Sequence, residues 1–454
     1  MSGYVAEFMD WVRAKNPGEA EYSRAIEGLA ESVAPVMERH PEYHRARILE
    51  RLVEPERAIM FRIPWTDDNG TTQVNRGYRV EMNSAIGPYA GGLRFHPTVS
   101  LEIVKYLAFE QVFRNSLTTL PMGGAHGGAD FDPKGKSDDE VMRFCTSFMI
   151  GLFPHLGAHT DILGSDIGVG SREIGYLFGA YRKLRNEFTG VLTGKGTAWS
   201  GSLVRPEATG YGAVYFAAEM LATRGETLEG KTCLVSGSGR VAQSAIEKII
   251  DLGGRAVSFS DANGYIHDPS GIDRNKLAFV KDLRSHQRGD IRAYGEKYPE
   301  ASYVAFDSNQ SCSPLLNHKG HCAFPAATQY EINAADAANL VKNGVRVVSE
   351  GATMPTSPEA VRLFLENRIL YGPAKAASAG GAAVAGLEMS QNSMRYSWTR
   401  EEVDNKLHGI MKHIHKACLE ASESYGAAGD YVVGADIAAF IKVADAMIAQ
   451  GLHG

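Results

Sequence analysis

The chain has 454 residues, enough for two or three domains, and its 44% hydrophobic and 22% charged residues are typical of a globular protein. A net charge of −6 and a pI of about 6.2 exclude the basic surface of a nucleic-acid-binding protein. No apolar run reaches the roughly 18 residues that a membrane span needs, and we expect neither a membrane partner nor a secretory signal. Five scattered cysteines favour a reducing cytoplasm over a disulfide framework.

The first half of the chain alternates helical and strand patterns. The first ~60 residues have helical spacing, most clearly from Ala20 to Met37. Met60 to Met82 alternates around the turn signal Asp67-Asp68-Asn69-Gly70, which predicts paired strands. Helices are predicted from Ser100, a candidate N-cap, to Thr119, and again from a capping box at Ser137 to Phe153.

Between those two helices, residues 121–128 read Pro-Met-Gly-Gly-Ala-His-Gly-Gly. Four glycines in six residues predict a loop whose backbone lies close to a ligand. His126 is the single ionisable side chain in this stretch.

The second half begins after residues 193–209, which are rich in Gly, Ser, Thr and Pro and predict a hinge. Short apolar strands are then predicted at residues 231–236, 256–260, 345–348 and 369–371, with helices between them and a helical tail from Arg400. Strands that alternate with helices indicate a parallel sheet with crossover helices.

A dinucleotide fingerprint lies at Gly237-Ser238-Gly239-Arg240-Val241-Ala242, between an apolar strand and a helix. The first glycine permits the tight turn, and the second lets a pyrophosphate approach the helix N-terminus. Asp261 ends the next strand, where an acid usually binds the ribose of NAD. The alternatives are a chance glycine-rich turn and a cap of the strand end.

Cys312, His318, His321 and Cys322 cluster within eleven positions, but their spacing fits no common zinc pattern. We expect a surface loop there and no metal site.

Long motifs along nearly the whole chain resemble the bacterial glutamate dehydrogenases of the Glu/Leu/Phe/Val dehydrogenase family. They lie at residues 16–19, 87–97, 109–111, 117–122, 130–135, 166–170, 205–212, 327–329, 350–352 and 386–389. The resemblance implies an α/β protein of two domains with a cleft between them. Residues 1–200, with a C-terminal helix at about 430–454, would be the substrate and oligomerisation domain, and residues 201–429 a Rossmann-like, doubly wound dinucleotide domain. It also implies a homohexamer that catalyses reversible oxidative deamination of a small molecule.

The same resemblance assigns roles to individual residues. Asp166 and His126 would be catalytic. Substrate-binding positions would be Ala90, Gly91, Gln111, Arg114, Ser378 and Ala385. Cofactor-binding positions would be Arg94, Thr209, Ser236, Gly237, Ser238, Gly239, Arg240, Val241, Asp261, Ala262, Ala327, Thr328, Thr353 and Ser378. Residues 260–264 resemble the Ser-Asp-Ser-Ser-Gly of NADP-dependent members. Lys281, Arg284 and Arg288 follow and could supply a cation for a 2′-phosphate, unless they form a solvated helix face. We therefore expect NADP, with NAD possible.

Several of these positions depart from the family pattern. Ala90 and Ala385 stand where a lysine and a serine hold the distal carboxylate of glutamate, so glutamate is not the expected substrate. Arg114 replaces a lysine that pairs with the α-carboxylate and keeps its charge. Thr353 and Ser378 each replace an asparagine.

His126 stands where the family has its catalytic lysine. Histidine exchanges protons near neutral pH, and a His126–Asp166 pair could carry the acid–base chemistry. The first hypothesis is therefore an NAD(P)-dependent oxidoreductase acting on CH-NH2 or C=N groups of an amino acid, imine or oxo acid other than glutamate. The alternative is a catalytically impaired protein that acts as a binding or assembly subunit.

Overall fold

The computed structural model describes residues 3–285, 289–306 and 317–453, which form two compact units. The first unit comprises residues 1–205, 384–403 and 436–454, and the second comprises residues 206–383 and 404–435. The predicted domain border lay at residue 200, and residues 384–403 were expected in the dinucleotide domain; by contacts these residues belong to the first unit. Each unit is described by itself below.

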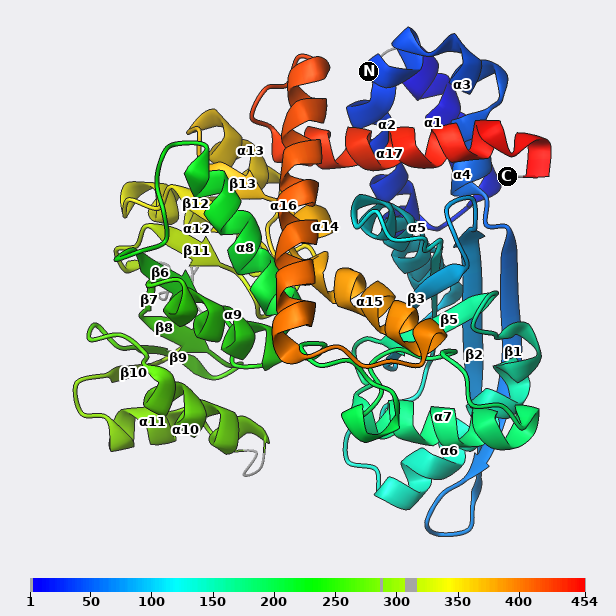
Figure 1. The fold of residues 1–454 in the computed structure, drawn as a ribbon, viewed down its shortest axis with the longest axis horizontal. Helices are drawn as coiled ribbons and strands as arrows, with labels where there is room; N and C mark the ends of the chain where they lie inside the picture. Colours follow the sequence, from blue (N-terminus) through cyan, green and yellow to red (C-terminus); the bar gives the residue numbers. More distant parts are fainter. Residues whose placement is uncertain (1–2, 286–288, 307–316, 454) are drawn as a thin grey trace. The chain divides into compact units, whose positions relative to one another are not determined.

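The first unit begins with four helices and continues into a mixed sheet (Figure 1). Its helices are α1 (Gly3–Lys15), α2 (Ala20–Arg39), α3 (Pro41–Arg45), α4 (Ile48–Val53), α5 (Leu101–Leu117), α6 (Asp138–Leu152) and α7 (Ser171–Arg185). Its strands are β1 (Arg57–Thr66), β2 (Thr72–Asn83), β3 (Tyr89–Phe95), β4 (Gly124–Ala129) and β5 (Asp161–Ser165). The predicted N-cap at Ser100 and the predicted capping box at Ser137 are both present.

The five strands lie in the order β1-β2-β4-β3-β5, so β4 is central. β4 is antiparallel to β2 and parallel to β3. One face packs on α6 and α7 through aromatic residues that include Phe95, Phe131 and Phe144. The other face lies against α5, so closely that a Cβ at Gly124 would be 2.3 Å from the Val112 side chain.

The prediction of a loop at residues 121–128 is wrong for most of that stretch, because residues 124–129 form the fully buried strand β4. Its glycines serve the packing of the sheet. A Cβ at Gly128 would be 2.2 Å from the Arg94 carbonyl oxygen, and one at Gly127 would be 2.8 Å from Leu93. The small residues therefore let β4 fit between α5 and its neighbouring strands.

The second unit contains a five-stranded parallel sheet in the order β13-β12-β11-β6-β7. These strands are β6 (Thr232–Val235), β7 (Arg255–Ala256), β11 (Cys322–Phe324), β12 (Val347–Ser349) and β13 (Leu370–Gly372). A smaller antiparallel sheet has the order β10-β9-β8, from β8 (Ser258–Ser260), β9 (Gly264–His267) and β10 (Ser302–Ala305). The strand predicted over residues 256–260 is thus divided between two sheets.

Helices cover both faces of the parallel sheet, which makes the unit doubly wound, as predicted. Ser349 donates a hydrogen bond to α8, whereas Val348 packs in a cluster with residues of α12 and α13. The helices of this unit are α8 (Ala208–Ala222), α9 (Arg240–Asp251), α10 (Arg274–Ser285), α11 (Arg292–Lys297), α12 (Ala334–Lys342), α13 (Pro358–Glu366) and α14 (Ala374–Ala377).

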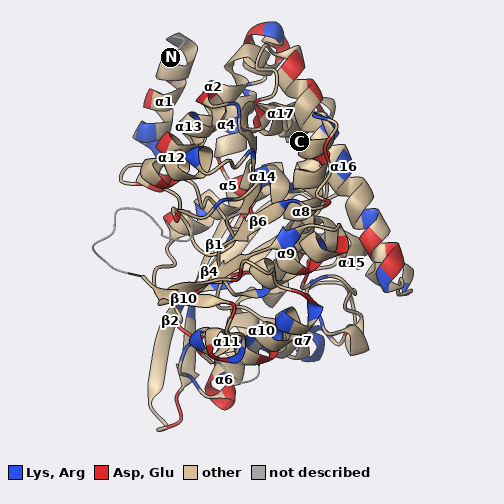
Figure 2. Cartoon of the chain, turned by 90° about the vertical axis from the view of Figure 1, so that its left-hand side faces the viewer, with Lys and Arg blue, Asp and Glu red and all other residues tan. Residues whose placement is uncertain are grey.

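The chain passes between the units within three C-terminal helices, α15 (Gly380–Met394), α16 (Arg400–Ser424) and α17 (Tyr431–Ala449). α16 carries both acidic and basic residues, and residues of both charges are interspersed over the face drawn in Figure 2. None of the helices in the described part of the chain has the length and apolarity that a bilayer crossing requires.

Candidate active site

The sheet of the first unit brings His126, Asp166 and Arg94 together. His126 lies on β4, Arg94 on β3 and Asp166 directly after β5. The Arg94 Nε donates a 2.8 Å hydrogen bond to Oδ2 of Asp166, and the His126 Nε2 lies 3.3 Å from the same oxygen. A Cβ at Gly92 would be 2.8 Å from the His126 ring, so the absence of a side chain there makes room for the imidazole.

The charge states of this group follow from its surroundings. Burial lowers the pKa of His126, Asp166 raises it, and Arg94 and Arg79 lower it further, so the net shift is downward. Burial alone would raise the pKa of Asp166, but His126 and Arg94 outweigh this and hold it well below its usual range. At neutral pH the site therefore holds a carboxylate beside a neutral imidazole.

The imidazole has spare hydrogen-bonding capacity. Both ring nitrogens are buried: Nε2 lies 3.3 Å from Oδ2 of Asp166, and Nδ1 makes no hydrogen bond within the described residues. A neutral imidazole carries one donor and one acceptor nitrogen. His126 can thus bind or accept a proton from a ligand while Asp166 remains ionised.

Three of the positions expected to bind substrate, Ala90, Gln111 and Arg114, lie on β3 and on α5, the helix that covers one face of the sheet. Ala90 is buried on β3, and its carbonyl oxygen accepts a hydrogen bond from Asn115 of α5. Gln111, one turn earlier, donates 2.7 Å to the Asn115 side chain. Arg114 is partly buried, and its Nε has no hydrogen-bond partner within the described part of the chain. Arg114 is therefore not an exposed surface arginine, and its guanidinium can pair with an anion.

Gly91 has a role in the packing of the sheet, and its expected contact with substrate stays a prediction. A Cβ there would be 1.6 Å from the Ala125 carbonyl oxygen, and the Gly91 carbonyl accepts from Arg79. Its small size is thus required for strand packing. Ala385 lies on α15 beside Gly386, where a Cβ would be 2.6 Å from Leu120 and 3.0 Å from Met122. Ala385 is therefore in the same unit as Ala90, next to the segment that leads into β4.

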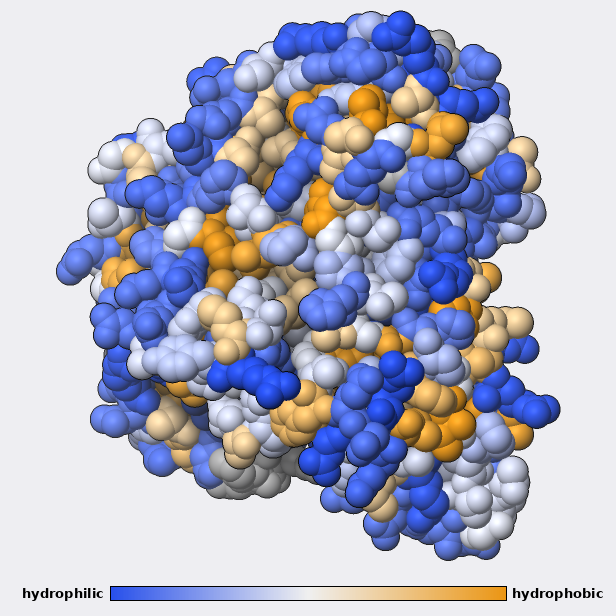
Figure 3. All heavy atoms as spheres, turned by 45° about the vertical axis from the view of Figure 1, so that its right-hand side comes forward, coloured by the Kyte–Doolittle hydropathy of each residue, from blue (hydrophilic) through white to orange (hydrophobic). Residues whose placement is uncertain are grey.

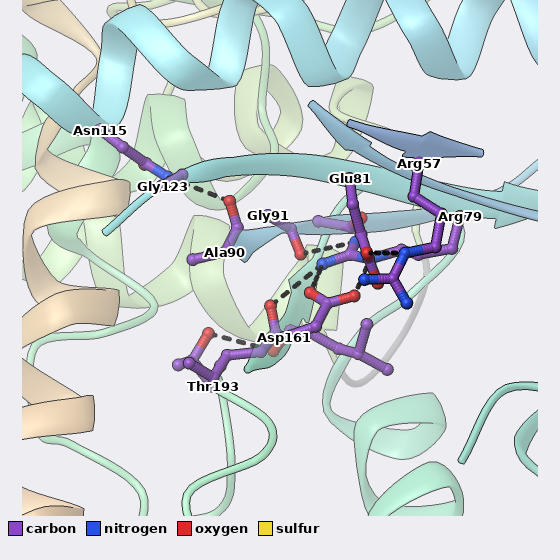
Figure 4. A network of polar contacts seen from close by, with 12 residues as sticks. Arg57, Arg79, Glu81, Ala90, Gly91, Asn115, Gly123, Asp161 and Thr193 are labelled. Atoms are coloured by element: carbon purple, nitrogen blue, oxygen red, sulfur yellow. Dashed lines mark hydrogen bonds and ion pairs between the residues drawn. The ribbon is translucent and has the colours of Figure 1, made fainter. Parts of the chain in front are cut away.

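Behind this site lies a buried ionic cluster that the sequence did not reveal (Figure 4). Arg79 of β2 forms a bidentate ion pair with Asp161 of β5, and both side chains are fully buried. Glu81 of β2 is also fully buried and lies 3.0 Å from the Arg57 Nε. A strand pattern alone gives no register, so no sequence signal joins β1, β2 and β5 at this point.

In the second unit, the dinucleotide fingerprint forms the turn from β6 to α9. Gly237 has a φ of +80°, and a Cβ there would be 2.6 Å from the Ala326 carbonyl oxygen, so glycine is needed. Gly239 precedes α9, and the position of its missing Cβ is open. The turn therefore has the space that a pyrophosphate needs at a helix N-terminus. Ser236 and Ser238 are buried, and Arg240 and Val241 are the first two residues of α9.

Other predicted cofactor positions follow neighbouring strands of the same sheet. The Ser236 Oγ accepts from the Ala326 N–H, next to Ala327 and Thr328. A Cβ at Gly351 would be 3.0 Å from the Val241 side chain, so the loop that contains Thr353 lies next to the fingerprint. Thr209 is the second residue of α8, and a Cβ at the next residue, Gly210, would be 2.4 Å from the Val241 carbonyl oxygen. Ser378 instead donates to the Ala374 carbonyl, so its hydroxyl is already engaged.

The expected ribose-binding acid also closes a turn. The Asp261 side chain accepts hydrogen bonds from the N–H groups of Asn263 and Gly264, beside exposed Ala262. Arg284 lies 4.0 Å from the Asp261 carboxylate, whereas Lys281 is paired with Glu247. Arg284 is thus the better-placed cation for a 2′-phosphate, and Arg288 lies outside the described residues.

The expected surface loop at the cysteine–histidine cluster is wrong for Cys322, which is buried in β11 opposite Cys233 of β6. His318 stacks on His267, and Cys312 lies outside the described residues. No group of metal ligands occurs among the residues that the structure describes.

Two family models match the chain. Glutamate/Leucine/Phenylalanine/Valine dehydrogenase covers residues 200–451, and the Glu/Leu/Phe/Val dehydrogenase dimerisation domain covers residues 55–183. The chain belongs to this dehydrogenase family. The family assignment made from the sequence motifs is confirmed, together with the two-domain α/β fold.

Individual members of the dehydrogenase family align over nearly the full length of the chain. The NAD(P)-specific glutamate dehydrogenase of Xylanibacter ruminicola is 55% identical over 99% of this chain and 100% of the relative. The NADP-specific glutamate dehydrogenase of Haemophilus influenzae is 51% identical over 98% of each. The crystal structure of Plasmodium falciparum glutamate dehydrogenase has a TM-score of 0.95 at 46% identity, covering 98% of this chain and 94% of that one. The chain is thus of the glutamate dehydrogenase type, and the roles of its individual site residues stay predictions.

Proposed function

We propose that this chain is an NAD(P)-dependent amino acid dehydrogenase that prefers NADP and acts on an amino acid other than glutamate. The observation that supports this proposal is that the site keeps some of the polar groups of the family pattern and lacks others. The site keeps an acid–base pair and a partly buried cation at Arg114, but it has methyl groups at Ala90 and Ala385, where the family resemblance expects a lysine and a serine. Burying a charge without its partner costs about 3–5 kcal/mol, so a substrate with a distal carboxylate is disfavoured.

His126 is proposed as the general base in place of the family's lysine. Its pKa lies below the ordinary value, so the neutral, proton-accepting form is present at pH 7. Asp166, fixed by Arg94, would orient the ring and stabilise the imidazolium once it forms. In the deamination direction His126 accepts a proton from the water that adds to the imine carbon and returns it to the nitrogen. The hydroxyl proton of the resulting carbinolamine follows by the same route, so that the C–N bond breaks and ammonia leaves as the C=O bond forms.

The dinucleotide would be held by the second unit. The open space at Gly239 and the N-terminus of α9 fit a pyrophosphate, and Arg284 beside Asp261 supports a 2′-phosphate. When bound, a nicotinamide cofactor supplies the hydride acceptor for the substrate Cα.

A substrate panel tests the proposal. The protein is incubated with ammonia, NADPH and 2-oxo acids whose side chains are apolar, polar or acidic, and the absorbance of NADPH is followed. A 2-oxo acid with an uncharged side chain should have a kcat/KM about 100-fold or more above that of 2-oxoglutarate, because the site lacks the charge partner of a distal carboxylate.

The other outcomes identify the competing functions. The identities with enzymes named glutamate dehydrogenase favour glutamate as a second candidate, which would be correct if 2-oxoglutarate were the best substrate. Bound NADPH, measured by fluorescence, without turnover of any oxo acid would instead indicate the impaired subunit.

A further inference from the structure

The carboxylate of Glu331 lies beside the dinucleotide fingerprint, on the loop that follows β11. Its Oε1 accepts a 3.0 Å hydrogen bond from the Ala327 N–H, and the carboxylate also accepts from the Thr328 N–H and the Ser236 hydroxyl. Ser236 directly precedes Gly237, the glycine of the tight turn. Glu331 therefore joins two of the segments expected to hold the cofactor, although no sequence motif singled it out.

The loop after β11 and the fingerprint turn pack closely together. The Ala326 N–H donates a 2.9 Å hydrogen bond to the Ser236 Oγ. A Cβ at Gly237 would be 3.1 Å from the Cα of Ala327, whose N–H binds the Glu331 carboxylate. Because like charges repel over such short separations, an anion bound at the turn disfavours the ionised form of Glu331.

Glu331 changes charge near neutral pH. Burial raises its pKa to about 7, the hydrogen bonds from Ser236, Ala327 and Thr328 oppose the rise, and the Asp336 carboxylate adds to it. Asp336 belongs to the capping box of α12, the helix that follows the loop. At pH 7 the carboxyl of Glu331 is thus divided between its neutral and its charged form.

Two further charged groups lie on elements that adjoin this loop. Arg240 is exposed at the start of α9 and stays protonated. Glu350 directly follows β12, and burial raises its pKa to about 7 as well. The Glu350 carboxylate accepts hydrogen bonds from the Tyr371 hydroxyl on β13 and from the Ala374 N–H on α14. Glu350 is therefore a carboxyl of similar pKa whose partners differ from those of Glu331.

We propose that Glu331 is a proton-linked positioning residue of the dinucleotide site: its carboxyl takes up a proton when the pyrophosphate of NADP(H) binds at the turn of residues 237–239. The neutral acid does not repel the phosphates, and its O–H can donate to the Ser236 Oγ. The hydroxyl hydrogen of Ser236, which the ionised carboxylate otherwise accepts, is then free to donate to a phosphate oxygen. This inference rests on the NADP(H) binding of the proposed function, and it makes binding weaker as Glu331 ionises with rising pH.

The pH dependence of NADPH affinity tests this role without turnover. The Kd is measured by NADPH fluorescence from pH 7 to 8.5, where a phosphate monoester, with its second pKa of about 6, stays ionised. The wild-type Kd should rise about three- to tenfold over this range, as for a carboxyl whose pKa increases by about one to two on binding. E331Q mimics the neutral acid, so its Kd should be nearly constant and should lie below the wild-type Kd at pH 8.5.

Proton uptake gives the second readout. Calorimetric titration with NADPH at pH 7.5, in HEPES and in Tris, measures the protons that the complex takes from the buffer. Wild type should take up about half a proton more than E331Q. The matched control is E350Q, which removes a buried carboxyl whose partners lie on β13 and α14 and should keep the wild-type pH dependence.

Equal pH dependence in wild type and E331Q would overturn the proposal. Weaker binding by E331Q at every pH would overturn it too, because a purely structural tie predicts that result. Loss of the pH dependence in E350Q alone would assign the proton to Glu350 instead. Absence of NADPH binding to folded wild type would contradict the proposed function as well, whereas the other results concern Glu331 alone.

Urea unfolding provides the folding check. Since the pKa of Glu331 is raised in the folded protein, the cost of ionising it to the stability of the fold is complete above about pH 7. E331Q should therefore be at least as stable as wild type at pH 8.5, and a change in its NADPH affinity then reports on the site and not on unfolding.

Discussion

At the scale of single residues, the charge balance around His126 can be changed one group at a time. Asp166 raises the pKa of His126, and Arg94 lowers it. We expect D166N to lower this pKa further, since the imidazolium loses its counter-ion, and R94Q to raise it. Exchange of the imidazole C2 proton, followed by mass spectrometry of the peptide that contains His126, measures both shifts. Shifts of the same sign in the two variants would contradict the electrostatic account.

The proposed change of substrate is also a residue-scale prediction. The triple variant A90K/A385S/H126K supplies the lysines and the serine that the family resemblance expects. It should raise kcat/KM for glutamate by about 10- to 100-fold, the worth of one charge-assisted hydrogen bond of about 1.5–3 kcal/mol. H126K alone is the control and should leave the preference among substrates unchanged. Absence of any gain in the triple variant would mean that the specificity does not depend on these positions.

At the scale of elements, β4 depends on its glycines. G128A places a Cβ 2.2 Å from the Arg94 carbonyl and should destabilise the fold by about 1–3 kcal/mol or more through overpacking. Gly28 is exposed in α2 with open space around it, and G28A should be neutral or stabilise by up to about 1 kcal/mol. Urea unfolding measures the free energy of both variants. A G128A protein as stable as G28A would show that β4 can shift to accommodate the methyl group.

Elements whose sequence signals are local were predictable from the sequence. The cap at Ser100, the capping box at Ser137 and the turn at Gly237 each depend on a few neighbouring residues. β4 was missed because its three glycines, Gly124, Gly127 and Gly128, carry neither the alternation nor the propensity of a strand. The cluster of Arg57, Arg79, Glu81 and Asp161 was missed because it depends on register between distant strands.

At the scale of the whole molecule, the first unit offers a surface for assembly. Apolar side chains are exposed at Met60 and Val74 on strands β1 and β2 and at Ile150 on α6, and β1 is an edge strand. Figure 3 shows hydrophobic residues among the hydrophilic ones on the face that it presents. We propose a homo-oligomer, in line with the dimerisation domain matched at residues 55–183. M60K/V74K should reduce the mass measured by light scattering, whereas the same change at exposed Leu452 should not. An unchanged mass would place the interface elsewhere.

The segmented first unit has a consequence for the order in which the protein can fold during synthesis. β4, which carries His126, and β5, which precedes Asp166, are made early, whereas α17 is made much later and contributes the buried residues Phe440, Val443 and Met447. Lys442 of α17 also donates to the Ser116 carbonyl at the end of α5, the helix that carries Arg114. The second unit needs nothing beyond residue 435. Completion of the half with the acid–base pair therefore depends on a helix that is made long after the strands of its sheet.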